Sequence, residues 1–346
     1  MNPAAAGAAA ALLPAAVVDS QPIGQGHINT TVRVFDADDG SWCLQRLNPN
    51  FADERMVMTN VEMVVSQLRR VGHPTIELAA TSDGCPWHVD DEGGVWRAYR
   101  WLPGTAAADH PAPRWTEIAQ LVGAFVAAVA ELDDSQVATV VDRFHDPLDR
   151  WTHLEEAVTA DRAGRVHQCS PDLRQLRSLA TRIWDETPAA RWTDLPRQIV
   201  HNDTKAANVV VDQDGSPVAL IDLDTTMMGS PLNDLGEFVR GCGAVEGPEG
   251  PAVLAQLALS FAAGMARPLT APEWAGLVSA GAVMSFENSV RAMTDHLDGD
   301  RYYDLGEGVN LARCQRHLHR SEQLLAMAPA AAVELDRLDE HSPSRG

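Results

Sequence analysis

The chain lacks the features that mark several large protein classes. Its five cysteines, spread over 346 residues, are odd in number and form no Cys-x-x-Cys pair. This pattern indicates free thiols in a reducing compartment and argues against a disulfide framework or a zinc site. No stretch approaches about 20 consecutive apolar residues, and the alanine-rich start lacks the basic residues that open a signal peptide. We therefore expect a cytoplasmic protein that does not insert into a membrane.

Basic residues are also scarce. The 27 Lys and Arg residues face 48 Asp and Glu residues, which gives a formal net charge of −21. This balance argues against electrostatic binding to nucleic acid or to an anionic membrane. An acidic surface also repels nucleotides, so a nucleotide site would need its own cations, backbone amides or bound metal. We expect a small-molecule substrate as partner, and the sequence leaves the oligomeric state unknown.

The chain does have a globular composition and the length for two lobes. Hydrophobic residues make up 45% and charged residues 22% of the sequence, and 346 residues exceed what one small core needs. We predict a flexible leader at 1–16 and an N-terminal nucleotide-binding lobe at 17–104. A C-terminal catalytic and substrate lobe follows at 105–327, and a loose tail at 328–346.

Local patterns give these two lobes different characters. In the first lobe, short β-branched runs at 31–35 and 42–47 flank an Asp-Gly turn and predict a hairpin. The apolar spacing over 53–70 predicts a helix, and 95–102 predicts a strand. The second lobe has helical spacing around one hairpin, with helices predicted at 115–132, 147–160, 173–184, 253–265, 272–294 and 310–327, and the hairpin at 209–223. The layout predicts an α+β fold: a protein-kinase-like two-lobe fold with a small mixed α/β N-terminal lobe and a mostly helical C-terminal lobe.

The strongest chemical signal is the octapeptide that begins at His201 and ends at Asn208, His-Asn-Asp-Thr-Lys-Ala-Ala-Asn. Phosphoryl transfer needs a carboxylate that orients the attacking hydroxyl and ligands that hold Mg²⁺ on the phosphates. Asp203 precedes Asn208 by five residues, which is the spacing of catalytic base and metal ligand in kinase-like enzymes. We predict Asp203 as the base and Lys205 as a cation that meets the transferring phosphate. His201 is predicted to brace the loop.

A second acidic motif follows one hairpin later. After a short apolar strand and an Asp-Gly turn, the chain reads Ile-Asp-Leu-Asp at 221–224. Kinase-like enzymes place a metal-binding Asp directly after this return strand. We therefore predict Asn208, Asp222 and Asp224 as the magnesium group, with Asp224 in a supporting position behind the ligands.

The nucleotide side of the site has weaker signals. Gly24 and Gly26 form a glycine-rich turn before the first strand, which could cover ATP phosphates with backbone amides. The third strand offers no lysine, so Arg46 is the predicted phosphate cation. Tyr99 and Trp101 lie in the predicted connection between lobes, where adenine would bind.

These segments resemble the aminoglycoside-phosphotransferase-like kinases and, within them, the N-acetylhexosamine 1-kinases. The catalytic octapeptide is typical of the whole superfamily. The Leu-Gln-Arg-Leu-Asn strand at 44–48 and the Thr-Asp-His-Leu-Asp-Gly-Asp-Arg-Tyr-Tyr run at 294–303 point to the narrower group. The resemblance spans 23–325, and its further segments lie at 24–29, 144–146, 221–225 and 310–315.

The resemblance implies ATP- and Mg²⁺-dependent phosphorylation of the anomeric hydroxyl of an N-acetylhexosamine. It also implies a sugar pocket, whose residues would be His27, Asp203, Arg291, Asp295, Tyr302 and Tyr303. Such polar side chains suit a neutral sugar, because each can satisfy one hydroxyl or N-acetyl oxygen. The surrounding family also contains kinases of choline, homoserine, methylthioribose and aminoglycosides.

The sequence leaves two alternative functions open. The acidic balance of the chain favours a kinase of the aminoglycoside type, which would bind a cationic acceptor. The absence of a lysine from the third strand favours a catalytically inactive binding protein with the same fold. The complete set of Asp203, Asn208 and Asp222 speaks against the second alternative, because a binding module needs neither a base nor metal ligands.

Overall fold

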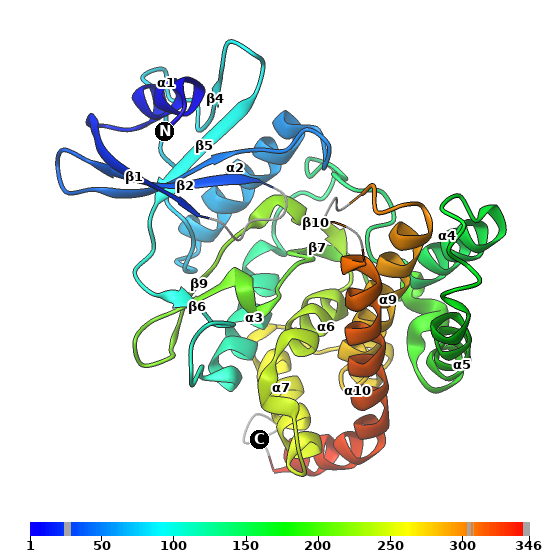
Figure 1. Ribbon diagram of the computed structural model, residues 1–346. Helices are drawn as coiled ribbons and strands as arrows, with labels where there is room; N and C mark the ends of the chain where they lie inside the picture. Colours follow the sequence, from blue (N-terminus) through cyan, green and yellow to red (C-terminus); the bar gives the residue numbers. More distant parts are fainter. Residues whose placement is uncertain (24–28, 303–305, 307, 342–346) are drawn as a thin grey trace.

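The two lobes of the α+β arrangement are present in the computed structural model, which describes residues 1–23, 29–302, 306 and 308–341 (Figure 1). The N-terminal lobe contains an antiparallel sheet with strand order β1-β2-β3-β5-β4. The predicted hairpin is confirmed as β2 and β3. The strands are β1 (Val17–Ile23), β2 (Thr30–Asp36), β3 (Ser41–Arg46), β4 (His88–Val89) and β5 (Val95–Arg100).

Side chains alternate between the two faces of the sheet along each strand, and both faces are buried. Along β3 and β5, Trp42, Leu44 and Trp96 point to one face and pack against helix α1 (Pro3–Leu12). Cys43 and Tyr99 point to the other face and join the main core, which includes helix α2 (Glu54–Arg70). Because both faces are covered, the sheet lies between two helices.

Helix α1 corrects the prediction of a flexible leader at 1–16, which is wrong for Pro3–Leu12. The Asn2 side chain accepts a hydrogen bond from the Ala5 N–H at 2.8 Å and caps the helix. Alanine is the best helix former, and its small side chain lets the helix lie close to the sheet. Ala8 and Leu12 are buried there.

The C-terminal lobe is mostly helical, as predicted, and carries two small strand groups. Strand β6 (Thr105–Ala106) pairs with the confirmed second hairpin, β8 (Val209–Val211) and β9 (Pro217–Leu220), and β7 (Gln198–Val200) pairs with β10 (Met227–Gly229). The helices are α3 (Trp115–Val129), α4 (Pro147–Ala160), α5 (Ser170–Glu186), α6 (Pro231–Gly241), α7 (Gly250–Gly264), α8 (Ala271–Gly276), α9 (Ala280–Leu297) and α10 (Val309–Glu340). Short 3-10 turns are η1 (Pro188–Asp194), η2 (Ala206–Asn208), η3 (Leu223–Thr225) and η4 (Gly243–Val245).

Three parts of this lobe differ from the sequence prediction. The tail predicted as loose continues α10 to Glu340, because Ala331 and Leu335 are buried. The single helix predicted at 272–294 is two helices, α8 and α9, with a break after Gly276. Helix α6 was not predicted, although its buried residues Leu232, Leu235 and Phe238 recur at helical spacing; the helix is short, with 11 residues.

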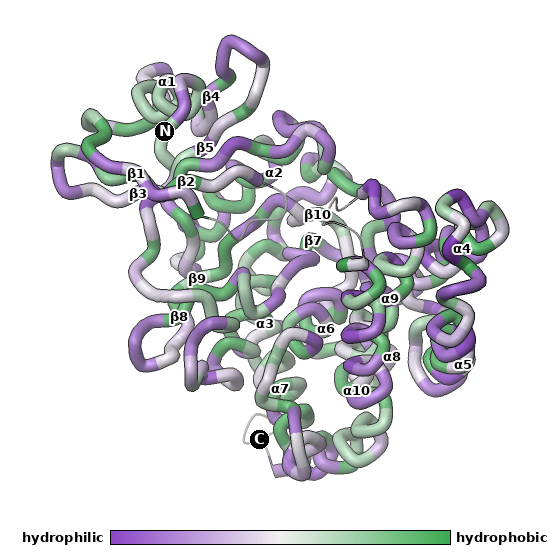
Figure 2. The backbone as a smooth tube through the Cα atoms, viewed as in Figure 1, coloured by the Kyte–Doolittle hydropathy of each residue, from purple (hydrophilic) through white to green (hydrophobic). Residues whose placement is uncertain are grey.

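Hydropathy follows this layering. In Figure 2, α3 and the central strands are largely hydrophobic, whereas α4 and α5 at the edge of the lobe show long hydrophilic stretches. Within the described part of the chain, no helix combines the length and apolarity that crossing a membrane requires.

Candidate active site

The loop that contains the predicted base is fixed to helix α6. The backbone N–H groups of His201 and Asn202 donate to the carboxylate of Asp234, at 2.9 and 2.6 Å. Asp234 is completely buried, and burial raises the pKa of its carboxyl to about 6, although the two N–H donors favour the ionised form. Asn202 has φ 64°, a left-handed conformation that Asn tolerates better than most residues. The anchor therefore bends the chain sharply just before Asp203.

The pKa of Asp234 gives a testable pH dependence of stability. Between the unfolded value of 3.8 and the folded value of about 6, the folded state holds more protons, so stability falls as pH rises. Relative to Asp234→Asn, we expect the free energy of unfolding of the wild type to decrease between pH 5 and 7.5, with most of the change below pH 6.5. Urea unfolding at several pH values measures this difference, and a constant difference would contradict the burial account.

His201 braces the loop, as predicted. Its Nδ1 accepts the Asp203 N–H at 3.2 Å, so Nε2 is the protonated nitrogen and donates to the Ile221 carbonyl at 3.0 Å. The Thr225 hydroxyl donates to the His201 carbonyl at 2.8 Å. These contacts tie the loop to the segment that carries the second acidic motif.

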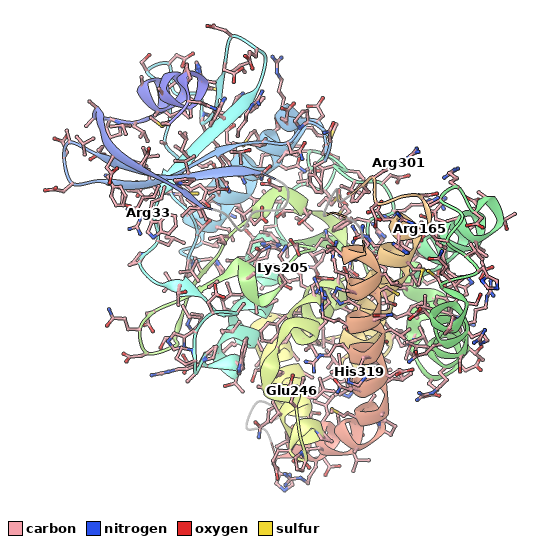
Figure 3. All side chains as sticks on the ribbon, in the orientation of Figure 1. Arg33, Arg165, Lys205, Glu246, Arg301 and His319 are labelled. Carbon is pink, nitrogen blue, oxygen red and sulfur yellow. The ribbon has the colours of Figure 1, made fainter. Side chains whose placement is uncertain are left out.

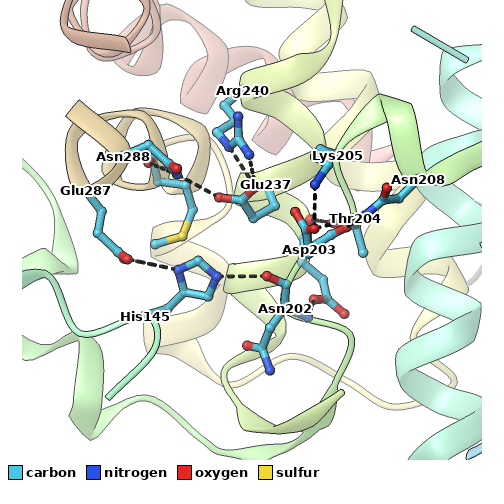
Figure 4. Close-up of polar contacts among 12 residues, drawn as sticks. His145, Asn202, Asp203, Thr204, Lys205, Asn208, Glu237, Arg240, Glu287 and Asn288 are labelled. Carbon is cyan, nitrogen blue, oxygen red and sulfur yellow. Dashed lines mark hydrogen bonds and ion pairs between the residues drawn. The ribbon is translucent and has the colours of Figure 1, made fainter. Parts of the chain in front are cut away.

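The predicted catalytic residues meet on the loop itself (Figure 4). Lys205 Nζ donates to Asp203 Oδ2 at 2.6 Å, and Asn208 Nδ2 donates to the same oxygen at 3.0 Å. Lys205 is the only lysine of the chain and lies near the centre of the molecule in Figure 3. Burial lowers its pKa, but Asp203 and Asp222 outweigh this effect and the pKa is raised. Lys205 therefore stays a cation beside the carboxylate of Asp203.

The second acidic motif lies across a small pocket from Asp203. The pocket is lined by Asn29, Phe51, Asp203, Asp222, Asp224 and Thr225. Asp222 has φ 62° and directly follows the hairpin, as predicted. Burial and the neighbouring carboxylate of Asp224 raise the pKa of Asp222 to about 6, against the lowering effect of Lys205. The site therefore gathers more negative charge than its own cations offset.

An arginine from the N-terminal lobe holds the other carboxylate. Arg97 on β5 forms a buried ion pair with Asp224, and its Nε donates to Gln45 at 2.9 Å. Asn29 donates to the second oxygen of Asp224 at 2.8 Å. Asp224 thus lines the same pocket as Asp222 and is engaged by two residues of the N-terminal lobe.

The structure does not bring the predicted phosphate cation, Arg46, to this pocket. Neighbouring residues of a strand point to opposite faces, so Gln45 faces Arg97 while Arg46 points away. Arg46 Nε lies 3.9 Å from an oxygen of Asp90, and 41% of its side chain is exposed. From the N-terminal sheet, the cation that contacts the acidic motif is Arg97 on the neighbouring strand β5.

The donor atoms suit a hard divalent cation such as Mg²⁺. Asp222 offers carboxylate oxygens in a buried site with excess negative charge, and an amide that donates through Nδ2, as Asn208 does, binds a metal through Oδ1. Within residues 1–23, 29–302, 306 and 308–341, no three His, Cys, Asp or Glu side chains form a ready metal cage. Mg²⁺ in phosphoryl-transfer sites is usually held by one or two carboxylates together with substrate phosphates.

The remaining predicted residues have varied positions. Gly24, Gly26, His27 and Tyr303 lie outside the described residues. Tyr99 packs in the core at 7% exposure, and Trp101 is covered by the Arg33 guanidinium, 4.3 Å from the ring centroid. Adenine binding at these two residues stays a prediction.

The predicted acceptor residues lie on and after helix α9. The Arg291 guanidinium lies 5.1 Å from the ring centroid of Phe144. Asp295 is buried and accepts hydrogen bonds at 2.8 Å from the Tyr302 N–H and from Asn310 Nδ2, so its carboxylate holds the following loop. The Tyr302 side chain is exposed. A direct sugar contact for these residues stays a prediction.

The chain is similar to a known protein family and to several solved structures. The model of the phosphotransferase enzyme family matches residues 19–269, well over half of the chain. A solved aminoglycoside phosphotransferase from Alicyclobacillus acidocaldarius subsp. acidocaldarius is 14% identical, with 96% of each chain covered and a TM-score of 0.59. A spectinomycin phosphotransferase in complex with ADP and spectinomycin is 13% identical, with 90% of this chain and 94% of that chain covered and a TM-score of 0.60. An amicoumacin kinase bound to AMP-PNP and Ca²⁺ is 14% identical, with 91% of each chain covered and a TM-score of 0.58. These likenesses confirm the kinase-like fold.

Proposed function

The chain belongs to the phosphotransferase enzyme family, and from this premise we propose that it is an ATP- and Mg²⁺-dependent small-molecule kinase. Residues 17–104 would serve as the nucleotide-binding lobe and 105–327 as the catalytic and substrate lobe. The observation that carries the proposal is the pocket that Asp203 shares with Asp222 and Asp224. Two separate segments thus supply the carboxylates that we propose as base and as metal ligand, the two groups that phosphoryl transfer requires.

The residues of the pocket have distinct roles in this proposal. Asp203 orients the acceptor hydroxyl and accepts its proton through Oδ1, because Oδ2 is held by Lys205 and Asn208. Lys205 offsets charge on the transferring phosphate. Asn208 and Asp222 would hold Mg²⁺, which neutralises charge between the ATP phosphates. The Arg97 ion pair offsets part of the negative charge that Asp224 adds beside Asp222.

For the acceptor, we propose the anomeric hydroxyl of an N-acetylhexosamine. The support is the resemblance at 44–48 and 294–303, together with the pairing of acidic side chains in the helical lobe. Three buried carboxylates of this lobe already have partners among the described residues. These are Glu237 with Arg240 and Asn288, Glu287 with His145, and Asp295 with Asn310. A polycation would have to displace these partners, whereas a neutral sugar would not.

The second candidate is a kinase of the aminoglycoside type. The net charge of −21 favours a cationic acceptor, and the aminoglycoside and spectinomycin phosphotransferases share the fold. Choline and homoserine are further small-alcohol acceptors in this alternative. A catalytically inactive binding protein is disfavoured, because Asp203, Asn208 and Asp222 are all in place.

Ionic strength distinguishes the two acceptor classes. For N-acetylglucosamine or N-acetylgalactosamine, we expect KM to change less than about twofold between 20 and 300 mM salt, because a neutral ligand is not screened. For an aminoglycoside, KM should rise steeply over the same range. The test measures ADP release with acceptors of both classes over this range of salt concentrations. Turnover of aminoglycosides alone, with a strong salt effect, would remove the hexosamine proposal and keep the kinase.

A further inference from the structure

Behind the catalytic loop lies a polar chain that the proposed function does not use (Figure 4). His145 precedes helix α4 and is buried. Its Nε2 is 2.9 Å from the carbonyl oxygen of Asn202. Its Nδ1 is 3.2 Å from both carboxylate oxygens of Glu287 on α9. The ring therefore spans the distance between helix α9 and the residue that precedes Asp203.

Both neighbours of the ring are hydrogen-bond acceptors. A neutral imidazole has a single N–H and would leave either the Asn202 carbonyl or the Glu287 carboxylate facing a lone pair. Burial lowers the pKa of His145, but Glu287 and the more distant Glu237 outweigh it, so the pKa is raised. Asp234 on α6 also lies within electrostatic range of the ring. The carboxylates of α9 and α6 thus favour the cationic ring that the geometry requires.

The peptide that His145 contacts decides where Asp203 points. Asn202 has φ 64°, and its N–H is already held by Asp234. Its side-chain Nδ2 donates to the Thr225 carbonyl at 3.1 Å. The His145 contact to the Asn202 carbonyl completes the restraint on the peptide group between Asn202 and Asp203. A left-handed residue persists when its surroundings hold it in this way.

The same segment is attached to α9 a second time. Arg291 lies one helical turn after Glu287, on the same face of α9. Its guanidinium lies over the ring of Phe144, the neighbour of His145. Helix α9 also carries Asp295, so the face that contacts residues 144–145 continues into the predicted acceptor residues.

We propose that His145 is a positioning residue that links helix α9 to the catalytic loop and fixes the direction of the Asp203 side chain. This inference rests on the proposed function, because it assigns to His145 a part in phosphoryl transfer. His145 acts through Asn202. Its loss should therefore lower kcat and leave nucleotide binding unchanged.

Two substitutions separate this role from simple packing. His145→Leu keeps the bulk of the side chain and removes both N–H donors. Glu287→Gln keeps the hydrogen-bonded link between α9 and Asn202 without its charges. The amide can donate to Nδ1 of a neutral His145, and the Nε2–H of that ring still donates to the Asn202 carbonyl. We expect His145→Leu to lower kcat by about 10- to 100-fold, the effect of a small misplacement of a catalytic group, with the affinity for ADP and the KM for ATP within about twofold of wild type. We expect Glu287→Gln to lower kcat by no more than about threefold.

The pH dependence of kcat separates this role from packing, because a change in packing alone would not alter it. The cationic ring exists below the raised pKa of His145, so wild-type kcat should fall as pH rises through that value. Glu287→Gln should lose this alkaline fall, because its link between α9 and Asn202 needs only the neutral ring. The proposal is overturned if His145→Leu turns over within twofold of wild type. It is also overturned if Glu287→Gln is as inactive as His145→Leu, or if kcat, ADP affinity and melting temperature decline together.

A spectroscopic measurement keeps this proposal separate from the proposed function. Two-bond ¹H–¹⁵N correlations of the imidazole groups, with His145 assigned from the signal missing in His145→Leu, report its protonation directly. Two protonated nitrogens at pH 7 support the proposal, and a neutral His145 ring overturns it, whichever acceptor the enzyme uses. A wild-type protein without turnover on any acceptor would instead refute the proposed function.

Discussion

Replacing Asp203 by Asn should lower kcat by about 10²- to 10⁴-fold, the range for loss of a positioned general base. The amide keeps the size of the carboxylate but cannot accept the proton of the acceptor hydroxyl. Calorimetric titration with ADP and Mg²⁺ should give a dissociation constant within a few-fold of wild type, because Asn208 and Asp222 remain. Initial rates at saturating ATP measure the loss.

A matched control is Asp214→Asn in the turn between β8 and β9, where the side chain is exposed. It makes the same chemical change in the hairpin that follows the catalytic loop and should leave kcat unaltered. If Asp203→Asn kept more than about a tenth of wild-type kcat, the assignment of Asp203 as the base would be wrong, since general-base loss costs at least about 10²-fold.

Replacing Arg97 by Met should destabilise the protein by about 3–5 kcal/mol, because breaking a buried ion pair leaves an uncompensated charge. Arg97 is 1% exposed and Asp224 is 5% exposed. Asn29 alone would then contact the carboxylate of Asp224 from the N-terminal lobe. Urea unfolding monitored by circular dichroism measures the change. The double variant Arg97→Met, Asp224→Asn should recover a large part of the loss, because the orphaned charge is gone.

Arg46→Met is the control for this experiment. Its partners, Asp90 and Glu92, lie 3.9 and 4.0 Å away, and its side chain is 41% exposed. Exposed pairs contribute about 0–1 kcal/mol, so this variant should unfold close to wild type and keep its KM for ATP. A rise in the KM for ATP with Arg46→Met would restore Arg46 as the phosphate cation. A loss of stability larger than that of Arg97→Met would contradict the assignment of the buried ion pair.

The parts of the fold that follow a local period could be predicted from the sequence. Both hairpins and helices such as α2 and α4 combine regular apolar spacing with clear turn or cap residues. The five-residue interval between Asp203 and Asn208 is likewise a local signal. It indicated the catalytic loop without any knowledge of the lobes.

The contacts that hold this loop could not be predicted, because they join residues far apart in sequence. Asp234 lies 31 residues after Asp203 on helix α6, and no local pattern connects the two segments. Arg97 and Asp224 are 127 positions apart in the sequence. Only the pairing of β3 with β5 shows that Gln45, and not a lysine, lies opposite Arg97. An arginine within an apolar strand run was the one available signal for Arg97. The resemblance includes 144–146, but no sequence signal linked His145 to Glu287, 142 positions away.

Phosphorus NMR of the wild-type protein with ATP, Mg²⁺ and N-acetylglucosamine or N-acetylgalactosamine tests the central claim most directly. The account predicts ADP together with a sugar phosphate whose phosphorus couples to the anomeric proton, formed only when Mg²⁺ is present and at a greatly reduced rate with Asp203→Asn. A phosphate on another hydroxyl would contradict the hexosamine assignment. If ATP stayed intact with every small alcohol tested, the claim that this pocket transfers phosphate would itself be contradicted.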